Sequence, residues 1–471
     1  MIKARWFTLS VISFLLSMIL VGCFPPVSKQ LSCDIPPPNS TSTQSKPLNI
    51  NIHVDGTPSM LGYVTSPNNA NTRYSQTIDL LEGTLSGGQP RGFQPKFKYY
   101  RLGQTSQEIP QQRTGYLEAR KPLFYDGSSS AFPSLQVSNI QTAINPGSND
   151  NLTVIITDLY ENAADLNGIA NAISQNYFST KESANAVGLF ARKSEFNGNV
   201  YLEDGTNKKF IYNTNDKQGN KISEFRPFYI IFLGQYQDIK YYFDRLEKAL
   251  TNNKELNKDS YLSIFSPSNI VNKLSSLQDK PKEIPQGINE LASINNNKLS
   301  IEVDQQPIHI FEIAKSRTDD NREFKLNYTV PLETLSNTLS MDLQSVKTDV
   351  KVQQYDRQDK EFKQLTSTSA EKNALQLSQW GADNNKLKFV TVIKPNNFPE
   401  PGVYYLQTDV LPQELQEQNW WKDWSTDNNT TTDWKTYKLY DFLQALRARA
   451  SSALQANKTT VARFCYLIQT N

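Results

Sequence analysis

Two stretches of the chain carry side-chain oxygens of the kind that hold a hard metal ion. Asp55, Thr57 and Ser59 alternate in the first stretch, and Asp158 stands in the second. Hydroxyl oxygens can bind Mg²⁺ without adding charge, and carboxylates can bind it directly or through water. Such ligands suit an ion that requires near-octahedral oxygen coordination and keeps several waters. Because little negative charge would surround the ion, it would stay electrophilic and favour a further carboxylate from outside.

An apolar run precedes each of these stretches. Residues 48–54 form a β-type run that leads into Asp55, and residues 152–157 form a β-branched run that ends before Asp158. Continuous apolar runs are typical of parallel strands that are buried on both faces. Open α/β sheets bind ligands beyond the carboxyl ends of their strands, which is where both stretches are expected.

The first stretch, Asp-x-Thr-x-Ser, resembles the metal-ion-dependent adhesion site of von Willebrand factor A domains, whose first loop reads Asp-x-Ser-x-Ser. Residues 157–158 are similar to the family's third loop, Thr-Asp-Gly, with Leu159 in place of the Gly. The family's second loop supplies a hydroxyl, usually from a Thr. Residues 127–130 fit that role with Ser130, and Ser129 is the alternative.

The resemblance implies a von Willebrand factor A-like, Rossmann-type domain over residues 48–270, with a mostly parallel sheet and helices on both faces. It also implies a Mg²⁺ or Mn²⁺ site formed by Asp55, Thr57, Ser59, Ser130 and Asp158. In the family, such an ion captures a protein partner through an Asp or Glu carboxylate. The alternatives are a metal-independent scaffold of the same fold, or a first stretch that only forms a turn and caps a helix.

An enzyme is not expected. The chain has only two histidines, His53 and His309, and a Ser-His-Asp triad, a Cys-His pair or a His-liganded zinc site needs a positioned His. His53 lies in the first strand, where a lone His is more often a packing residue. It also occupies the place where a haloacid-dehalogenase-type phosphatase has its nucleophilic Asp, which closes that route. A metal-dependent hydrolase is the remaining catalytic alternative, with Glu161 as the nearby carboxylate outside the proposed metal shell.

Strand-like and helix-like segments alternate over residues 48–270, which predicts a parallel sheet covered on both faces. The expected strands are 48–54, 96–102, 152–157, 184–190 and 228–233, and the expected helices are 72–85, 165–173 and 238–250. Within residues 188–201 the pair Asn197-Gly198 predicts the turn of a hairpin inserted near the sheet edge.

The apolar period changes to two beyond a polar linker at residues 271–296. The alternation predicts a β-sandwich over residues 297–412. Its expected strands are 324–330, 346–352, 387–393 and 404–410. Residues 413–471 contain a cluster of tryptophans, a helix near 437–454 and a strand near 461–468. We expect the tryptophans to be buried between the sandwich and this helix, with an exposed contact patch as the alternative.

The first residues predict export and a lipid anchor. Lys3 and Arg5 precede an apolar run, which is typical of a secretory signal peptide, here over residues 1–22. The run ends in Leu-Val-Gly-Cys, which resembles the lipobox of bacterial lipoproteins and implies that Cys23 is lipidated. Residues 23–47 are rich in Pro, Ser and Thr, so we expect a flexible linker after the lipid.

The expected location is the bacterial cell envelope, in the periplasm or at the cell surface, with the membrane bound through the lipid. Phe24 replaces the Asp that retains many Gram-negative lipoproteins at the inner membrane, which favours an outer membrane where one exists. In an exported protein Cys33 and Cys465 are either a disulfide or two separate thiols. The 49 basic and 47 acidic side chains nearly balance and form no basic stretch, so nucleic acid is not an expected partner.

Overall fold

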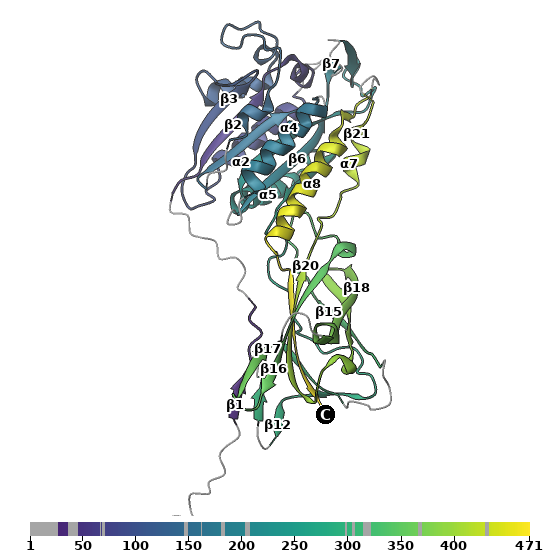
Figure 1. Ribbon diagram of the computed structural model, residues 1–471. Helices are drawn as coiled ribbons and strands as arrows, with labels where there is room; N and C mark the ends of the chain where they lie inside the picture. The colour runs from purple at the N-terminus through teal and green to yellow at the C-terminus, as the bar shows by residue number, and fades with distance from the viewer. Residues whose placement is uncertain are drawn as a thin grey trace, which may run out of the picture.

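The computed structural model describes most of the chain after the predicted signal peptide. The described residues are 27–35, 46–65, 67, 71–145, 149–161, 163–179, 184–202, 208–296, 299–303, 307–313, 322–365, 370–428 and 433–471. The predicted signal peptide and Cys23 lie outside them. In Figure 1 an α/β unit lies above a second unit that is built mainly from strands.

A seven-stranded sheet forms the centre of the α/β unit. Its strands, in spatial order, are β10 (Ser260–Phe265), β6 (Asn185–Ser194), β9 (Arg226–Gln235), β5 (Asn151–Thr157), β2 (Asn49–Asp55), β3 (Lys96–Leu102) and β4 (Ser106–Glu108). β2 pairs in parallel with β3 and β5, but every other pairing in this sheet is antiparallel. The predicted mostly parallel sheet is therefore wrong, and the α/β unit has a mixed sheet.

The strands β6 and β9 explain this error. All residues of both strands are buried, which is why they read as continuous apolar runs. Burial on both faces follows from helices above and below the sheet, and it does not depend on strand direction. The chain between β6 and β9 returns β9 beside β6, so the two strands pair antiparallel along their whole length.

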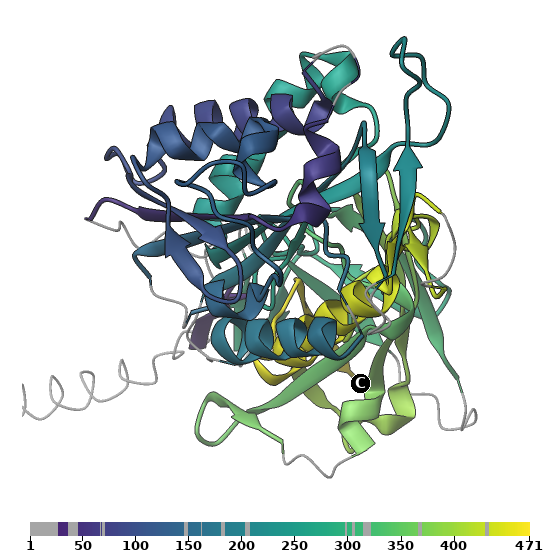
Figure 2. The same ribbon diagram turned by 90° about the horizontal axis from the view of Figure 1, so that it is seen from above.

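Helices cover both faces of this sheet, as expected. α2 (Arg73–Ser86) and α5 (Tyr236–Thr251) pack on one face, where their apolar residues share a core with β2, β5 and β9. α4 (Ala163–Ile173) and α8 (Leu439–Ala456) lie side by side on the other face (Figures 1 and 2). The short helices α3 (Arg113–Leu117) and α6 (Lys254–Asn257) flank the unit. His53 is buried in β2 and stacks on Tyr100, with ring centroids 4.6 Å apart.

The second unit contains a six-stranded and a three-stranded sheet. The larger sheet has the order β11 (Ile288–Leu291), β14 (Ile308–Ile313), β23 (Ala462–Thr470), β20 (Gly402–Leu411), β16 (Lys347–Asp356) and β17 (Glu361–Gln364). The smaller one has the order β15 (Phe324–Pro331), β19 (Lys386–Ile393) and β18 (Leu375–Asp383). The sheets touch where Phe389 stacks on Phe464, with ring centroids 4.4 Å apart.

Two segments expected to be linkers contain strands. β11 and β12 (Ile294–Asn296) lie within the expected linker 271–296. β1 (Val27–Gln30) lies within the expected flexible linker 23–47 and pairs in parallel with β13 (Leu299–Glu302). Strand pairing uses backbone groups, so a polar composition does not exclude it.

The structure contains the disulfide between Cys33 and Cys465, whose Cα atoms lie 6.0 Å apart. Cys465 lies in β23, so the bond ties the start of the described chain to the larger sheet of the second unit.

Trp420, Trp421 and Trp424 are buried, but not where we expected them, and Trp434 is half-buried. Trp420 and Trp421 begin α7 (Trp420–Asp423) and stack on Tyr261 and Phe265 of β10, with ring centroids 5.0 and 5.7 Å apart. α8 packs on the α/β unit, so the tryptophans that precede it meet that unit as well.

The inserted hairpin also differs from its prediction. Asn197-Gly198 begins β7 (Asn197–Tyr201), which pairs with β8 (Lys209–Asn213), and so does not form the turn. A Cβ atom on Gly198 would lie 3.0 Å from the Cα atom of Gly62, in the short helix η1 (Pro58–Tyr63). Glycine therefore permits β7 to approach the loop that follows β2.

Candidate metal centre

Asp55, Thr57 and Ser59 form one hydrogen-bonded group at the end of β2. Asp55 Oδ1 accepts hydrogen bonds from the backbone N of Thr57 at 3.0 Å and from its Oγ1 at 2.7 Å. Thr57 Oγ1 lies 3.0 Å from Ser59 Oγ. The three predicted side chains of the first stretch therefore face one another.

The local sequence produces this arrangement. The carbonyl oxygen of Gly56 accepts a hydrogen bond from Arg101 Nη2 at 2.9 Å, and a Cβ atom on Gly56 would lie 2.4 Å from Arg101 Nε. Only glycine leaves room for this contact. Pro58 then begins η1, since proline is favoured at the first helical position, and the chain turns directly after Thr57.

β5 brings Asp158 to the same edge of the sheet. Val54 of β2 is paired in parallel register with Ile156 of β5, so both strands end together. Asp158 Oδ1 accepts a hydrogen bond from Tyr160 N at 3.2 Å, and its carboxylate also faces the Ser59 hydroxyl. Thr157 Oγ1 donates to Asp55 Oδ2 at 3.2 Å and so links the two stretches.

Leu159 follows Asp158 in an unusual backbone conformation. Its φ is +50°, in the left-handed region that glycine adopts more easily than other residues. Leu159 is 1% exposed, so the apolar contacts of its side chain hold the backbone in this conformation. A Gly could adopt this φ without such support.

Ser138 lies beside Asp55, whereas Ser130, which we expected there, does not. Ser130 is exposed in a turn that Ser129 closes by accepting a hydrogen bond from Phe132 N at 3.0 Å. Ser138 faces the Asp55 carboxylate and lowers its pKa. Its buried Oγ makes no hydrogen bond of regular geometry with the described residues. An orphaned buried hydroxyl beside a carboxylate fits the role of a metal ligand.

The two carboxylates are buried without a cation in direct contact. Burial raises the pKa of Asp55, although hydrogen bonds from Thr57 and Thr157 and the nearby Ser138 hydroxyl oppose this rise. Burial and the charge of Asp55 raise the pKa of Asp158 to about 6, and Arg226 partly opposes the rise. Within the described residues, neither carboxylate forms an ion pair at up to 4.0 Å. Two such groups disfavour joint ionisation unless a cation joins them.

The donor set fits a hard divalent ion. It consists of the Asp55 and Asp158 carboxylates and the hydroxyls of Thr57, Ser59 and Ser138, and all are oxygens as Mg²⁺ and Mn²⁺ prefer. Within the described part of the chain, no group of three or more His, Cys, Asp or Glu side chains is placed to hold a metal ion. Hydroxyls and water would have to complete the coordination here.

Two buried arginines flank the carboxylates, and our sequence reasoning missed both. Arg101 in β3 is 5% exposed, and Arg226 at the start of β9 is 2% exposed. In the antiparallel register, Tyr229 of β9 faces Thr157 of β5, so the residues before Tyr229 lie beside those that follow Thr157. Arg101 could have been predicted, because it lies near the carboxyl end of the expected strand 96–102. Arg226 could be located only once the direction of β9 was known.

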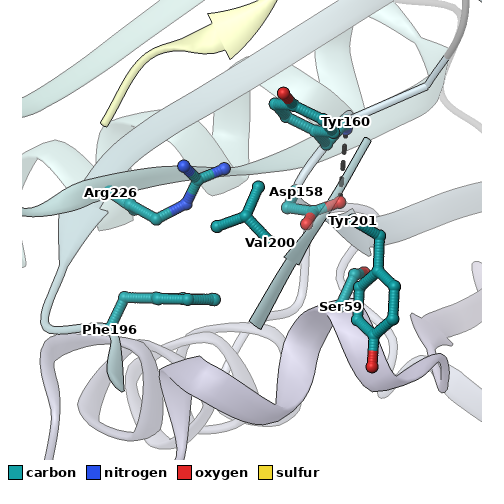
Figure 3. A pocket seen from close by; sticks show the side chains of 7 residues that line it. All are labelled: Ser59, Asp158, Tyr160, Phe196, Val200, Tyr201 and Arg226. Atoms are coloured by element: carbon teal, nitrogen blue, oxygen red, sulfur yellow. Dashed lines mark hydrogen bonds between the residues drawn. The ribbon is translucent and has the colours of Figure 1, made fainter. Parts of the chain in front are cut away.

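A small pocket opens beside the centre. The space inside it is about 10 Å³, which is room for about one water molecule. Figure 3 shows Arg226 on one side of it and Asp158 and Ser59 on the other. Its seven lining residues are Ser59, Asp158, Tyr160, Phe196, Val200, Tyr201 and Arg226.

Comparison with known proteins gives no family for this chain. No protein-family model matches it, and no curated protein matches it. In the described residues, no helix is long and apolar enough to span a membrane. Function is therefore inferred from the centre itself.

Proposed function

We propose that this protein is an envelope lipoprotein that binds a protein partner through a Mg²⁺ or Mn²⁺ ion. Asp55, Thr57, Ser59 and Asp158 would hold the ion, with Ser138 as the second-loop hydroxyl. In this proposal the α/β unit is of the von Willebrand factor A type, the second unit is a β-sandwich and Cys23 carries the lipid.

One observation carries the proposal. Two buried carboxylates converge with three hydroxyls at one edge of the sheet, and one of these hydroxyls is an orphaned buried group. Burying carboxylates without a counter-ion is unfavourable, and a divalent cation would remove that cost. When bound, the ion would supply an electrophilic position for a partner's carboxylate.

The test is Mn²⁺ binding, measured by calorimetry and by electron paramagnetic resonance. We expect the wild type to bind one Mn²⁺ and Asp55→Ala to lose binding, because that variant removes a carboxylate of the proposed site. Asp79→Ala is the matched control, since Asp79 is an exposed carboxylate that pairs with Arg120 at 2.7 Å. Unchanged Mn²⁺ affinity in Asp55→Ala would refute the metal centre.

The flanking arginines favour one second candidate, a partner-binding scaffold that needs no metal. Arg101 and Arg226 both act on the carboxylates through their charge, and they could balance the pair without an ion. Capture of an envelope partner in the presence of EDTA would support this candidate. Loss of capture in EDTA, with recovery on addition of Mg²⁺, would exclude it.

A further inference from the structure

The start of the described chain is fastened to the second unit at two places. All four residues of β1 pair with β13, and β1 begins at Val27, four positions after Cys23. Cys33 lies three positions beyond β1 and forms the disulfide with Cys465 of β23. A disulfide does not depend on strand pairing, so each fastening holds this segment without the other.

Hydrogen bonds hold the backbone on either side of the disulfide as well. The carbonyl oxygen of Ser32 accepts a hydrogen bond from Tyr405 Oη at 3.1 Å, and that of Asp34 accepts one from Arg463 Nη1. Tyr405 lies in β20 and Arg463 lies in β23, the two central strands of the larger sheet. Residues 32–34 are therefore part of the body of the second unit.

This fastening shortens the tether between the predicted lipid and the body. A fully extended chain spans at most about 3.6 Å per residue, so Val27 would lie within about 14 Å of a lipidated Cys23 and Cys33 within about 36 Å. A tether that stayed free as far as Leu48 could reach about 90 Å by the same rule. The part of the body next to β1 would therefore stay close to the membrane that holds the lipid.

β1 and the candidate metal centre lie at opposite ends of the molecule. In Figure 1 β1 is at the end of the second unit that points away from the α/β unit. β7, which contributes Val200 and Tyr201 to the pocket beside the centre, is at the far end of the α/β unit in the same view. A short tether at the β1 end would thus leave the centre pointing away from the membrane.

The surface beside β1 carries no excess of either charge. Cys33 belongs to the apolar cluster that contains Tyr355 of β16 and onto which Phe362 of β17 packs. The turn between these two strands therefore lies next to the fastening. Residues 356–363 hold three acidic and three basic side chains. Because anionic lipids attract segments in which Lys and Arg accumulate, the tether and not charge would keep this turn at the membrane.

We propose that the second unit is the membrane-facing part of this protein, with the turn between β16 and β17 at the lipid headgroups and the candidate metal centre on the side away from the anchoring membrane. The partner of this end of the second unit is the surface of the bilayer that holds Cys23. A protein partner would then reach the metal centre from the aqueous space beyond the molecule. The inference rests on the proposed function, because it requires the lipid on Cys23, but it does not require the metal ion.

Energy transfer from a fluorescent residue to a headgroup-labelled lipid tests this orientation. The lipidated full chain is placed in nanodiscs, with the donor introduced at Gln358 in the β16–β17 turn or at Lys217 after β8, both of which are exposed. Transfer falls steeply with distance, so we expect it to be several-fold stronger from Gln358 than from Lys217. Added salt should leave both values unchanged, because charge does not hold the turn.

Two insertions of one flexible Gly-Ser segment separate the tether from the rest of the linker. Placed between Pro26 and Val27, the segment lengthens the chain before the fastening, so transfer from Gln358 should fall several-fold. Placed between Asn39 and Ser40, it lengthens the chain after the fastening and should leave this transfer unchanged. The second insertion is the matched control, since both add the same residues to the same expected linker.

Three outcomes would overturn the orientation. Equal transfer from Gln358 and Lys217 in the lipidated wild type would show that the molecule lies along the membrane. Equal effects of the two insertions would show that residues 23–47 act as one free tether. Mass spectrometry that finds no lipid on Cys23 would remove the anchor of the proposed function and this inference with it, whereas the metal centre would still be judged by Mn²⁺ binding alone.

Discussion

Asp158 is the residue at which stability and the proposed metal binding would be most directly coupled. Burial and the neighbouring Asp55 raise its pKa from 3.8 to about 6 in the folded, metal-free protein. Between these two values the folded chain keeps a proton that the unfolded chain releases. The free energy of unfolding that Asp158 contributes therefore falls as pH rises through this window. A bound divalent ion would reverse the effect, since it would favour the ionised carboxylate.

We expect Mg²⁺ to stabilise the protein little at pH 5 and strongly at pH 7, because a proton competes with the ion below the Asp158 pKa of about 6. The shift in the Asp158 pKa changes the free energy of unfolding by at most about 3 kcal/mol. The measurement is denaturant unfolding at several pH values, with Mg²⁺ and with EDTA. Equal stabilisation by Mg²⁺ at pH 5 and pH 7 would contradict the expectation.

The same unfolding measurements on Asp158→Asn supply the control, because burial also shifts the pKa of two histidines in this pH range. Burial lowers the pKa of both His53 and His309 from 6.5 to about 4. Between these values the unfolded chain holds a proton that the folded chain lacks, so the free energy of unfolding rises with pH. This slope is opposite to that of Asp158. Only the difference between the wild type and Asp158→Asn isolates the carboxylate.

At the residue scale, the candidate side chains that follow strands could be located from the sequence. The apolar runs mark where β2 and β5 end. They therefore indicated that Asp55, Thr57, Ser59 and Asp158 would lie at one edge of the sheet. Ser138 lies in an irregular segment between α3 and β5 that has no period, so nothing indicated which serine turns inward.

At the element scale, η1 and the β7–β8 hairpin shape the pocket through one close contact. A Cβ atom on Gly62 would lie 2.4 Å from the ring of Phe196, which is a pocket wall. We expect Gly62→Ala to displace this ring and to lower the free energy of unfolding by about 1–3 kcal/mol, as overpacking does. Denaturant unfolding measures the change.

Gly83→Ala is the matched control for this substitution. Gly83 is exposed in α2, and its Cβ would meet nothing within 4 Å. Replacing it should raise the free energy of unfolding by about 1 kcal/mol, because alanine has the higher helix propensity. If both variants were stabilised, the contact between Gly62 and Phe196 would not constrain the hairpin.

Element types were predicted better than element directions. Each expected helix and strand of the α/β unit is present within a few residues, because apolar periodicity reports burial. It does not report pairing, and so it missed the antiparallel β9. The periodicity also missed β1. Its partner β13 follows the whole α/β unit in sequence, so no local pattern indicates the pairing.

At the scale of the whole molecule, the C-terminal segment joins the two units. α7 and α8 pack on the α/β unit, and β23 then returns between β14 and β20 of the second unit. The apolar stripe of α8 could be predicted, but the surface it covers depends on contacts with residues far away in sequence. The boundaries expected at residues 271 and 413 mark changes in composition. They do not indicate that the segment after residue 413 packs on both units.

The Cys33–Cys465 disulfide adds a covalent link to this arrangement, across a sequence separation of 432 residues. A cross-link over so long a loop restricts the unfolded chain, and loss of a native disulfide typically costs about 2–5 kcal/mol. We expect Cys33→Ser to lower the free energy of unfolding by an amount in this range under non-reducing conditions. A reducing agent should destabilise the wild type to a similar extent and leave Cys33→Ser unaffected. Thiol titration of the denatured protein supplies the control, since the wild type should show no free thiol from Cys33 or Cys465. Two free thiols, or a reductant effect that persists in Cys33→Ser, would show that this disulfide is not the source of the stabilisation.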